Sequence, residues 1–242
     1  MGHDITFLVG LPMGKRNMSP IVETSIDIWL TGSIKAGDLV QKSYSISNRV
    51  DWNRTNIMFL GKKLKTNVIM IDSDVIPETP YKEVKKYLFE DFNKGYDVVF
   101  APMLTHDGNP QFNPMNAKAY EEKGIFPIYT SGFGFVAFSR RLVEVLQPIR
   151  YIDIITEMLL QSGIKQEEIK NIIKKLSYEE LDKPINYQTY EKTLPMYFTY
   201  TTSRSEDIEF CERMLRQGIK MGVDTRIKVK HMTEVPFVFR KK

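Results

Sequence analysis

The chain of 242 residues contains one cysteine, Cys211, and no long apolar run. A single cysteine forms neither an internal disulfide nor a multi-cysteine metal site, which is typical of a protein in a reducing cytoplasm. The longest apolar stretches, such as Val68–Ile71, fall far short of the roughly 20 residues that a membrane-spanning helix needs. No charged and then apolar leader precedes the first strand-like segment. We therefore expect a cytoplasmic protein whose contact with a membrane is at most peripheral.

The chain also lacks a strong excess of charge of either sign. Its 34 Lys and Arg residues against 30 Asp and Glu residues give a net charge of +4. The basic residues are scattered, so this balance does not indicate a nucleic-acid partner. Hydrophobic residues make up 42% and charged residues 26%, which excludes disorder and collagen-like repetition. At about 100–200 residues per domain, we expect a single domain over residues 1–242.

Strand-like and helix-like patterns alternate along the chain. Val68–Ile71 is wholly apolar and is followed at once by acidic residues, which is typical of a buried parallel strand where it leaves a sheet. The alternation predicts an α/β fold with a mixed, mostly parallel sheet and helices on both faces. The expected strands are Ile5–Val9, Val68–Ile71, Asp97–Leu104 and Gly134–Phe138, and the expected helices are Ile21–Leu30, Tyr81–Phe92 (begun by Thr79 and Pro80) and Arg140–Leu146 (capped by Ser139).

Two segments depart from the alternation. Residues 105–127 are rich in Asn, Pro and Gly and predict a long loop, and loops of that length are often functional. Residues 151–202 predict a helical insertion with a tyrosine-rich end.

The first candidate for chemistry is the acidic turn Asp72-Ser73-Asp74. Open α/β sheets bind ligands at the carboxyl ends of their strands. Two carboxylates on one turn repel each other unless a cation or hydrogen-bond donors compensate. Magnesium or manganese supplies that charge and binds one or two carboxylates together with phosphate oxygens. The plainer interpretation is a solvated turn that contains two aspartates.

Two later signals carry less information on their own. Glu206 and Asp207 fall in the first turn of a predicted helix, where the helix dipole favours acidic residues without any function. Ile208, Cys211 and Leu215 would form the buried stripe of that helix, and Asp207 could serve as a general base. His231 ends a short strand-like pattern, and it becomes a candidate metal ligand only if the aspartate pair lies close to it.

Taken in order, these motifs resemble the nucleotide-sugar glycosyltransferases of the GT-A fold, and most closely their family 2-like members. The likeness extends from about Asp4 to His231 apart from Tyr151–Thr202, and its motifs are Val68–Asp74, Ser131–Arg141, Ser205–Cys211 and His231. It implies a GT-A, Rossmann-like sheet. The chain lacks the Gln-x-x-Arg-Trp motif and the membrane helices of the processive polymer synthases, so transfer of a single sugar is expected.

The resemblance also assigns roles on the donor side. Asp74 would bind the Mn²⁺ or Mg²⁺ ion that bridges the two donor phosphates, and His231 would complete its coordination. Asp72 would face the ribose or a metal-bound water. The other donor-binding residues that it implies are Leu11 and Pro12 beside the nucleotide base, Arg54 near the donor, and Ser73.

On the acceptor side, Asp207 matches the family's base and Glu206 its acidic neighbour. Gly132, Phe133 and Gly134 would lie near the acceptor sugar. We expect residues 151–202 to shape the acceptor site through tyrosine stacking, and oligomer contact or core packing is the alternative. The implied reaction moves a hexose from a UDP- or GDP-sugar to an acceptor hydroxyl, with inversion if Asp207 is the base. Some relatives of this architecture retain configuration instead.

Two other functions stay open at this point. A haloacid-dehalogenase-like phosphatase also places Asp-x-Asp after an apolar strand, with Asp72 as nucleophile and Asp74 as general acid. That fold carries the motif on its first strand, whereas about 70 residues precede it in this chain. The other alternative is a nucleotide-sugar-binding module without catalysis.

Overall fold

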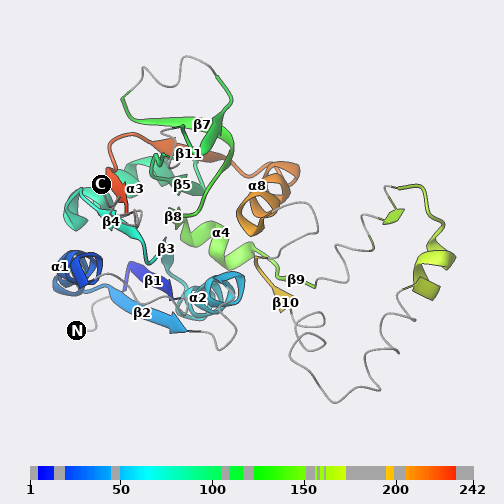
Figure 1. Ribbon diagram of the computed structural model, residues 1–242, viewed down its shortest axis with the longest axis horizontal. Coiled ribbons are helices and arrows are strands. Elements are labelled where there is room, and N and C mark those ends of the chain that lie inside the picture. Colours follow the sequence, from blue (N-terminus) through cyan, green and yellow to red (C-terminus); the bar gives the residue numbers. More distant parts are fainter. Residues whose placement is uncertain are drawn as a thin grey trace, which may run out of the picture.

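An eight-stranded sheet in the order β2-β1-β3-β8-β5-β11-β7-β6 organises the part of the chain that the structure describes (Figure 1). The computed structural model describes residues 5–13, 20–44, 50–104, 109–116, 123–150, 156, 159–160, 162–172, 195–198 and 205–232. The strands of the sheet are β1 (Phe7–Met13), β2 (Leu39–Tyr44), β3 (Asn67–Ile71), β5 (Val98–Phe100), β6 (Phe112–Pro114), β7 (Ile125–Ser131), β8 (Phe135–Phe138) and β11 (Met221–Asp224).

Most strands of this sheet run in one direction. Strands β2 and β3 are parallel to β1, and β11 is parallel to β5. Strand β8 is antiparallel to both β3 and β5, and β7 is antiparallel to both β11 and β6. Only β8 and β7 therefore oppose the others, and the predicted mixed, mostly parallel sheet is confirmed.

Helices cover both faces of the sheet, as predicted (Figure 1). The helices are α1 (Pro20–Lys35), α2 (Val50–Leu64), α3 (Tyr81–Asn93), α4 (Arg140–Val145) and α8 (Glu206–Arg216). Alternate side chains of β3 point to opposite faces, so Ile69 belongs to the buried cluster that includes residues of α1 and α3, whereas Val68 belongs to the cluster that includes residues of α2, α4 and α8. Burial on both faces explains why the strand is continuously apolar. No helix among the described residues is both long enough and apolar enough to cross a bilayer.

Several predicted elements differ in extent from the observed ones. Helix α1 continues five residues past its predicted end, to Lys35. The strand expected over Asp97–Leu104 is confined to β5, and Leu104 forms only an isolated bridge with Pro110. The long loop expected over residues 105–127 contains β6 and the start of β7 in its described parts. The cap of α4 is confirmed, since the Ser139 side chain accepts a hydrogen bond from the N–H of Leu142.

The predicted buried stripe of α8 was right for Cys211, partly right for Leu215 and wrong for Ile208. Ile208 is 38% exposed, whereas Phe210, Cys211 and Met214 are fully buried. Both stripes have helical spacing. The aromatic ring decides between them, because Phe210 packs against Phe133 at 5.4 Å between ring centroids and against other rings of the core.

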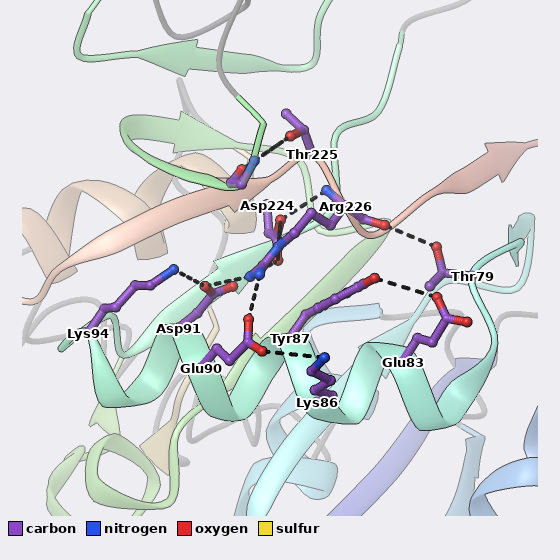
Figure 2. Close-up of polar contacts among 11 residues, drawn as sticks. Thr79, Glu83, Lys86, Tyr87, Glu90, Asp91, Lys94, Asp224, Thr225 and Arg226 are labelled. Atoms are coloured by element: carbon purple, nitrogen blue, oxygen red, sulfur yellow. Dashed lines mark hydrogen bonds and ion pairs between the residues drawn. The ribbon is translucent and has the colours of Figure 1, made fainter.

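A polar network fixes the chain after β11 onto α3 (Figure 2). Arg226 donates hydrogen bonds to Asp224 at 2.8 Å, Asp91 at 2.9 Å and Glu90 at 2.6 Å. The carboxyl groups of Asp91 and Asp224 are both fully buried in this network, where each lies near the other. Burial is the largest cause, and Asp224 the next, of the rise in the pKa of Asp91 to about 7.

The same network leads into a two-stranded sheet beside the main one. The N–H of Lys228 donates to the Thr79 hydroxyl at 2.8 Å, and that hydroxyl donates to the carbonyl of Arg226 at 3.2 Å. The chain then forms β12 (Val229–His231), which pairs antiparallel with β4 (Val75–Pro77). This pairing brings His231 beside the turn that follows β3.

Candidate active site

The acidic turn lies at the edge of the sheet where β3 ends and β8 begins. Ile71 pairs with Phe135, and the N–H of Asp72 donates to the carbonyl of Gly134 at 2.9 Å. The amino-terminal parts of α2 and α8 supply Arg54 and Glu206 to the same edge. The carboxyl ends of the strands and the amino ends of two helices therefore meet where the sequence predicted a site.

Arg54 lies at the centre of this edge and contacts carboxylates from two elements. Its Nη2 donates to both oxygens of Asp72 at 2.7 and 2.9 Å, and its Nη1 donates to Oε1 of Glu206. The side chain is almost fully buried, with the guanidinium 5.1 Å from the centre of the Phe133 ring. Asp72 and Glu206, two of the predicted site residues, are thus held by the protein's own cation.

The electrostatics of this cluster follow from burial and from the number of charges. Burial alone would lower the pKa of Arg54, but the charges of Asp72 and Glu206 outweigh it and raise that pKa. Burial also raises the pKa of Asp72, and the charges of Asp74 and Glu206 add to this rise against the opposing effect of Arg54. One guanidinium is shared between two carboxylates, so the edge keeps an excess of negative charge.

Asp74 and His231 come together although 157 residues separate them in the chain. His231 Nε2 lies 3.3 Å from Asp74 Oδ2, and the N–H of Met232 donates to the Asp74 carbonyl at 2.8 Å. About half of the Asp74 side chain is exposed. Among the described residues, no group of three or more His, Cys, Asp and Glu side chains is placed to hold a metal ion. The chain thus supplies two potential ligands here.

Asp207 lies in the first turn of α8 and faces Gly132. Its Oδ1 accepts hydrogen bonds from the Ser205 hydroxyl and from the N–H of Ile208. Its Oδ2 would lie 3.7 Å from a Cβ atom added to Gly132, and Oε1 of Gln111 would lie 3.0 Å from the same point. Any side chain at position 132 would therefore contact both a carboxylate and an amide. Sequence reasoning missed Gln111, because an isolated glutamine in a loop gives no signal.

Other predicted site residues serve the packing of this edge. Leu11 and Pro12 are buried at the end of β1, and Leu11 packs in the core between the sheet and helices α1 and α3. Phe133 lies in the aromatic core. A Cβ atom at Gly134 would lie 2.0 Å from the sulfur of Met103, so any side chain there would have to displace the end of that methionine. Ser73 is half-buried in the acidic turn.

The end of the 151–202 insertion also reaches this region. Thr55 Oγ1 accepts hydrogen bonds from the N–H groups of Tyr197 and Phe198, and Arg213 donates to the Tyr197 carbonyl. Both aromatic side chains are fully buried, so at these two positions the segment packs into the core. Residues 166–172 are helical, as expected. The other tyrosines of the predicted acceptor segment, Tyr178, Tyr187, Tyr190 and Tyr200, lie outside the described residues.

Comparisons with known proteins bear on the fold. No family model and no curated protein matches the chain. Among solved structures, it is similar to A197 from STIV, with 14% identity and a TM-score of 0.54 over 95% of this chain and 86% of that chain.

Weaker likenesses include a glycosyltransferase involved in the glycosylation of the major capsid of PBCV-1, with 12% identity and a TM-score of 0.37 over 58% of this chain and 63% of that chain. CMP:2-keto-3-deoxy-manno-octonic acid synthetase has 10% identity and a TM-score of 0.36 over 92% and 90%. These two TM-scores are too low to support a conclusion about the fold or the function of the chain. The chain thus shares the mixed α/β fold of A197 from STIV.

Proposed function

We propose that the protein is a metal-dependent, GT-A-like glycosyltransferase that moves one sugar from a nucleoside-diphosphate sugar to an acceptor hydroxyl. The observation that carries this proposal is the convergence of Asp74 and His231 at the carboxyl edge of the sheet. Asp207 lies at the same edge, with its Oδ2 3.7 Å from the point that a Cβ atom on Gly132 would occupy. A metal-bridged diphosphate and a carboxylate base are the two elements that such a transfer needs.

The Asp74–His231 pair is compatible with a divalent cation. Two neighbouring ligands of an octahedral ion, each about 2.1 Å from it, lie roughly 3 Å apart. The 3.3 Å between Asp74 Oδ2 and His231 Nε2 is close to that separation. Two protein ligands also suit an ion that completes its coordination with water and the donor's phosphates. When bound, the cation would stabilise the negative charge that develops on the leaving diphosphate.

Asp207 is the better candidate for the base of the two acidic residues at the start of α8. Glu206 is buried and pairs with Arg54, so its carboxylate is already engaged. The Oδ1 atom of Asp207 is fixed by Ser205 and the N–H of Ile208, which leaves Oδ2 directed toward Gly132. From there Oδ2 would accept the proton of an acceptor hydroxyl as it attacks, which favours an inverting reaction.

The geometry disfavours the phosphatase alternative. A nucleophilic aspartate must present a carboxylate oxygen to the substrate phosphate, but both oxygens of Asp72 accept hydrogen bonds from Arg54. With the Asp72 carboxylate held against Arg54, the exposed Asp74 is better suited to meeting a ligand, and the Asp-x-Asp turn to binding a cation.

Calorimetric titration with UDP, GDP, CMP and ADP, each with Mn²⁺ and with EDTA, tests the proposal. We expect one of the nucleoside diphosphates to bind only when Mn²⁺ is present, and we expect D74N to lose that binding. The matched control is D27N, which changes an aspartate that is equally exposed (53% against 54%) but pairs with Lys42 and not with His231. Binding of no nucleotide in the panel, or equal binding with EDTA, would contradict the proposal. Binding by the wild type with no release of diphosphate from any sugar donor would favour a non-catalytic binding module.

A further inference from the structure

Three consecutive residues of α2 each hold a different segment of the site edge. The Nδ2 group of Asn53 donates to the carbonyl of Met13 at the end of β1, at 2.7 Å. Thr55 Oγ1 accepts from the N–H of Tyr197 at 3.2 Å. Arg54, between them, bonds to the acidic turn and to the start of α8. One turn of α2 therefore contacts four segments that are far apart in the sequence.

Arg54 has the strongest of these contacts and no route to a ligand. It is 3% exposed, and its guanidinium lies between Asp72, Glu206 and the Phe133 ring. Its Nε atom is buried without a hydrogen-bond partner, while Nη1 and Nη2 are both occupied by carboxylates. A donor phosphate could reach this guanidinium only by displacing one of them.

We propose that Arg54 is a positioning residue that fixes the turn carrying Asp74 to the helix carrying Asp207. The roles of Asp74 and Asp207 in binding and transfer rest on the proposed function. An arginine suits position 54 because of both its charge and its shape. Asp72 and Glu206 would repel each other if left side by side, and a planar fork can donate to both at once. A lysine ammonium is a single point charge and would satisfy one of them at a time.

The substitution R54K tests this role, and R213K is its matched control. Arg213 is also a buried helical arginine, at 6% exposed, with its guanidinium 5.4 Å from the centre of the Phe210 ring and its Nε paired with Glu209. It makes no contact with Asp72 or Asp74. Both substitutions therefore remove a buried, stacked guanidinium, but only one removes the link between the acidic turn and α8.

Titration of Mn²⁺ in the presence of the nucleotide that the wild type binds gives the first readout. We expect R54K to weaken the affinity for Mn²⁺ by about tenfold or more, because Asp74 loses its fixed position beside His231. R213K should stay within about twofold of the wild type even where urea unfolding shows a similar loss of stability. Equal effects of the two substitutions, or no effect of R54K, would overturn the positioning role.

A metal-free measurement separates this proposal from the proposed function. The charge of Glu206 also acts on Asp72 through space, but its hydrogen bond reaches the acidic turn through Arg54. E206Q should therefore shift the backbone amide resonance of Asp74 clearly in the wild-type background and much less in the R54K background. If the wild type binds no metal, the proposed function fails, and the amide shifts still decide the role of Arg54. A shift of equal size in both backgrounds would overturn it, as would no shift in either.

Discussion

Replacing Asp91 with asparagine should change how the stability of the protein depends on pH. Asparagine has the shape of a protonated aspartate, so its amide would donate permanently to Asp224 while its oxygen accepts from Arg226 (Figure 2). The substitution therefore preserves the contacts of the low-pH form and removes the ionisation. Any difference in pH dependence between the two proteins then reports on this one carboxyl group.

The sign of the effect follows from the raised pKa of Asp91. Burial and then Asp224 raise it from 3.8 to about 7 in the folded protein, so the folded state binds more protons than the unfolded state between those values. The free energy of unfolding must then fall as pH rises through that window. At about 1.4 kcal/mol per pKa unit, the limit of this loss is about 4 kcal/mol. Because Arg226 and Lys94 can rearrange around the ionised pair, we expect about 2–4 kcal/mol.

The assay is urea unfolding between pH 4.5 and 8.5, followed by the fluorescence of the two tryptophans. The unfolding free energy of D91N minus that of the wild type should rise by about 2–4 kcal/mol across this range. The control E90Q removes a carboxylate that binds the same arginine but is 39% exposed, and its difference from the wild type should stay nearly constant. A pH-independent difference for D91N would refute the raised pKa of Asp91.

Three further substitutions test other parts of the account. G134A should lower the free energy of unfolding by about 1–3 kcal/mol in urea, because the new Cβ meets the Met103 sulfur at 2.0 Å; an unchanged stability would show that the methionine moves aside at no cost. S139A should cost about 1 kcal/mol in the same assay, since it removes the acceptor that caps α4. D207N should leave Mn²⁺-dependent nucleotide binding intact and slow sugar transfer by roughly 10²–10⁴-fold; full transfer by this variant in a diphosphate-release assay would remove Asp207 from the role of base.

The fold class was predictable because its signal is local. Val68–Ile71 is apolar without interruption since the strand is buried on both faces, and Gly95 marks the end of α3 through its positive φ of 89°. Strands β2 and β11 were not predicted. Polar residues of β2 such as Gln41 and Lys42, and the short length of β11, hide the apolar pattern.

The partners of the site residues were less predictable, because they depend on contacts between distant segments. The Asp-x-Asp turn was located from the sequence, but the pairing of Asp72 with Arg54 was not. The same limitation applies to α8, where two stripes had helical spacing and only the aromatic core showed that Phe210 lies inside and Ile208 outside. Leu11, Pro12 and Phe133 are all buried. The donor and acceptor roles that the resemblance implies for these three residues stay predictions.

The most direct test of the central claim is the paramagnetic effect of Mn²⁺ on the imidazole resonances of the three histidines, His3, His106 and His231. With the diphosphate that binds in calorimetry present, substoichiometric Mn²⁺ should broaden the His231 signals selectively, and D74N should abolish this broadening. The substitution H231Q identifies the resonance. Broadening of all three histidines alike, or of His231 equally in D74N, would contradict a divalent cation site formed by Asp74 and His231.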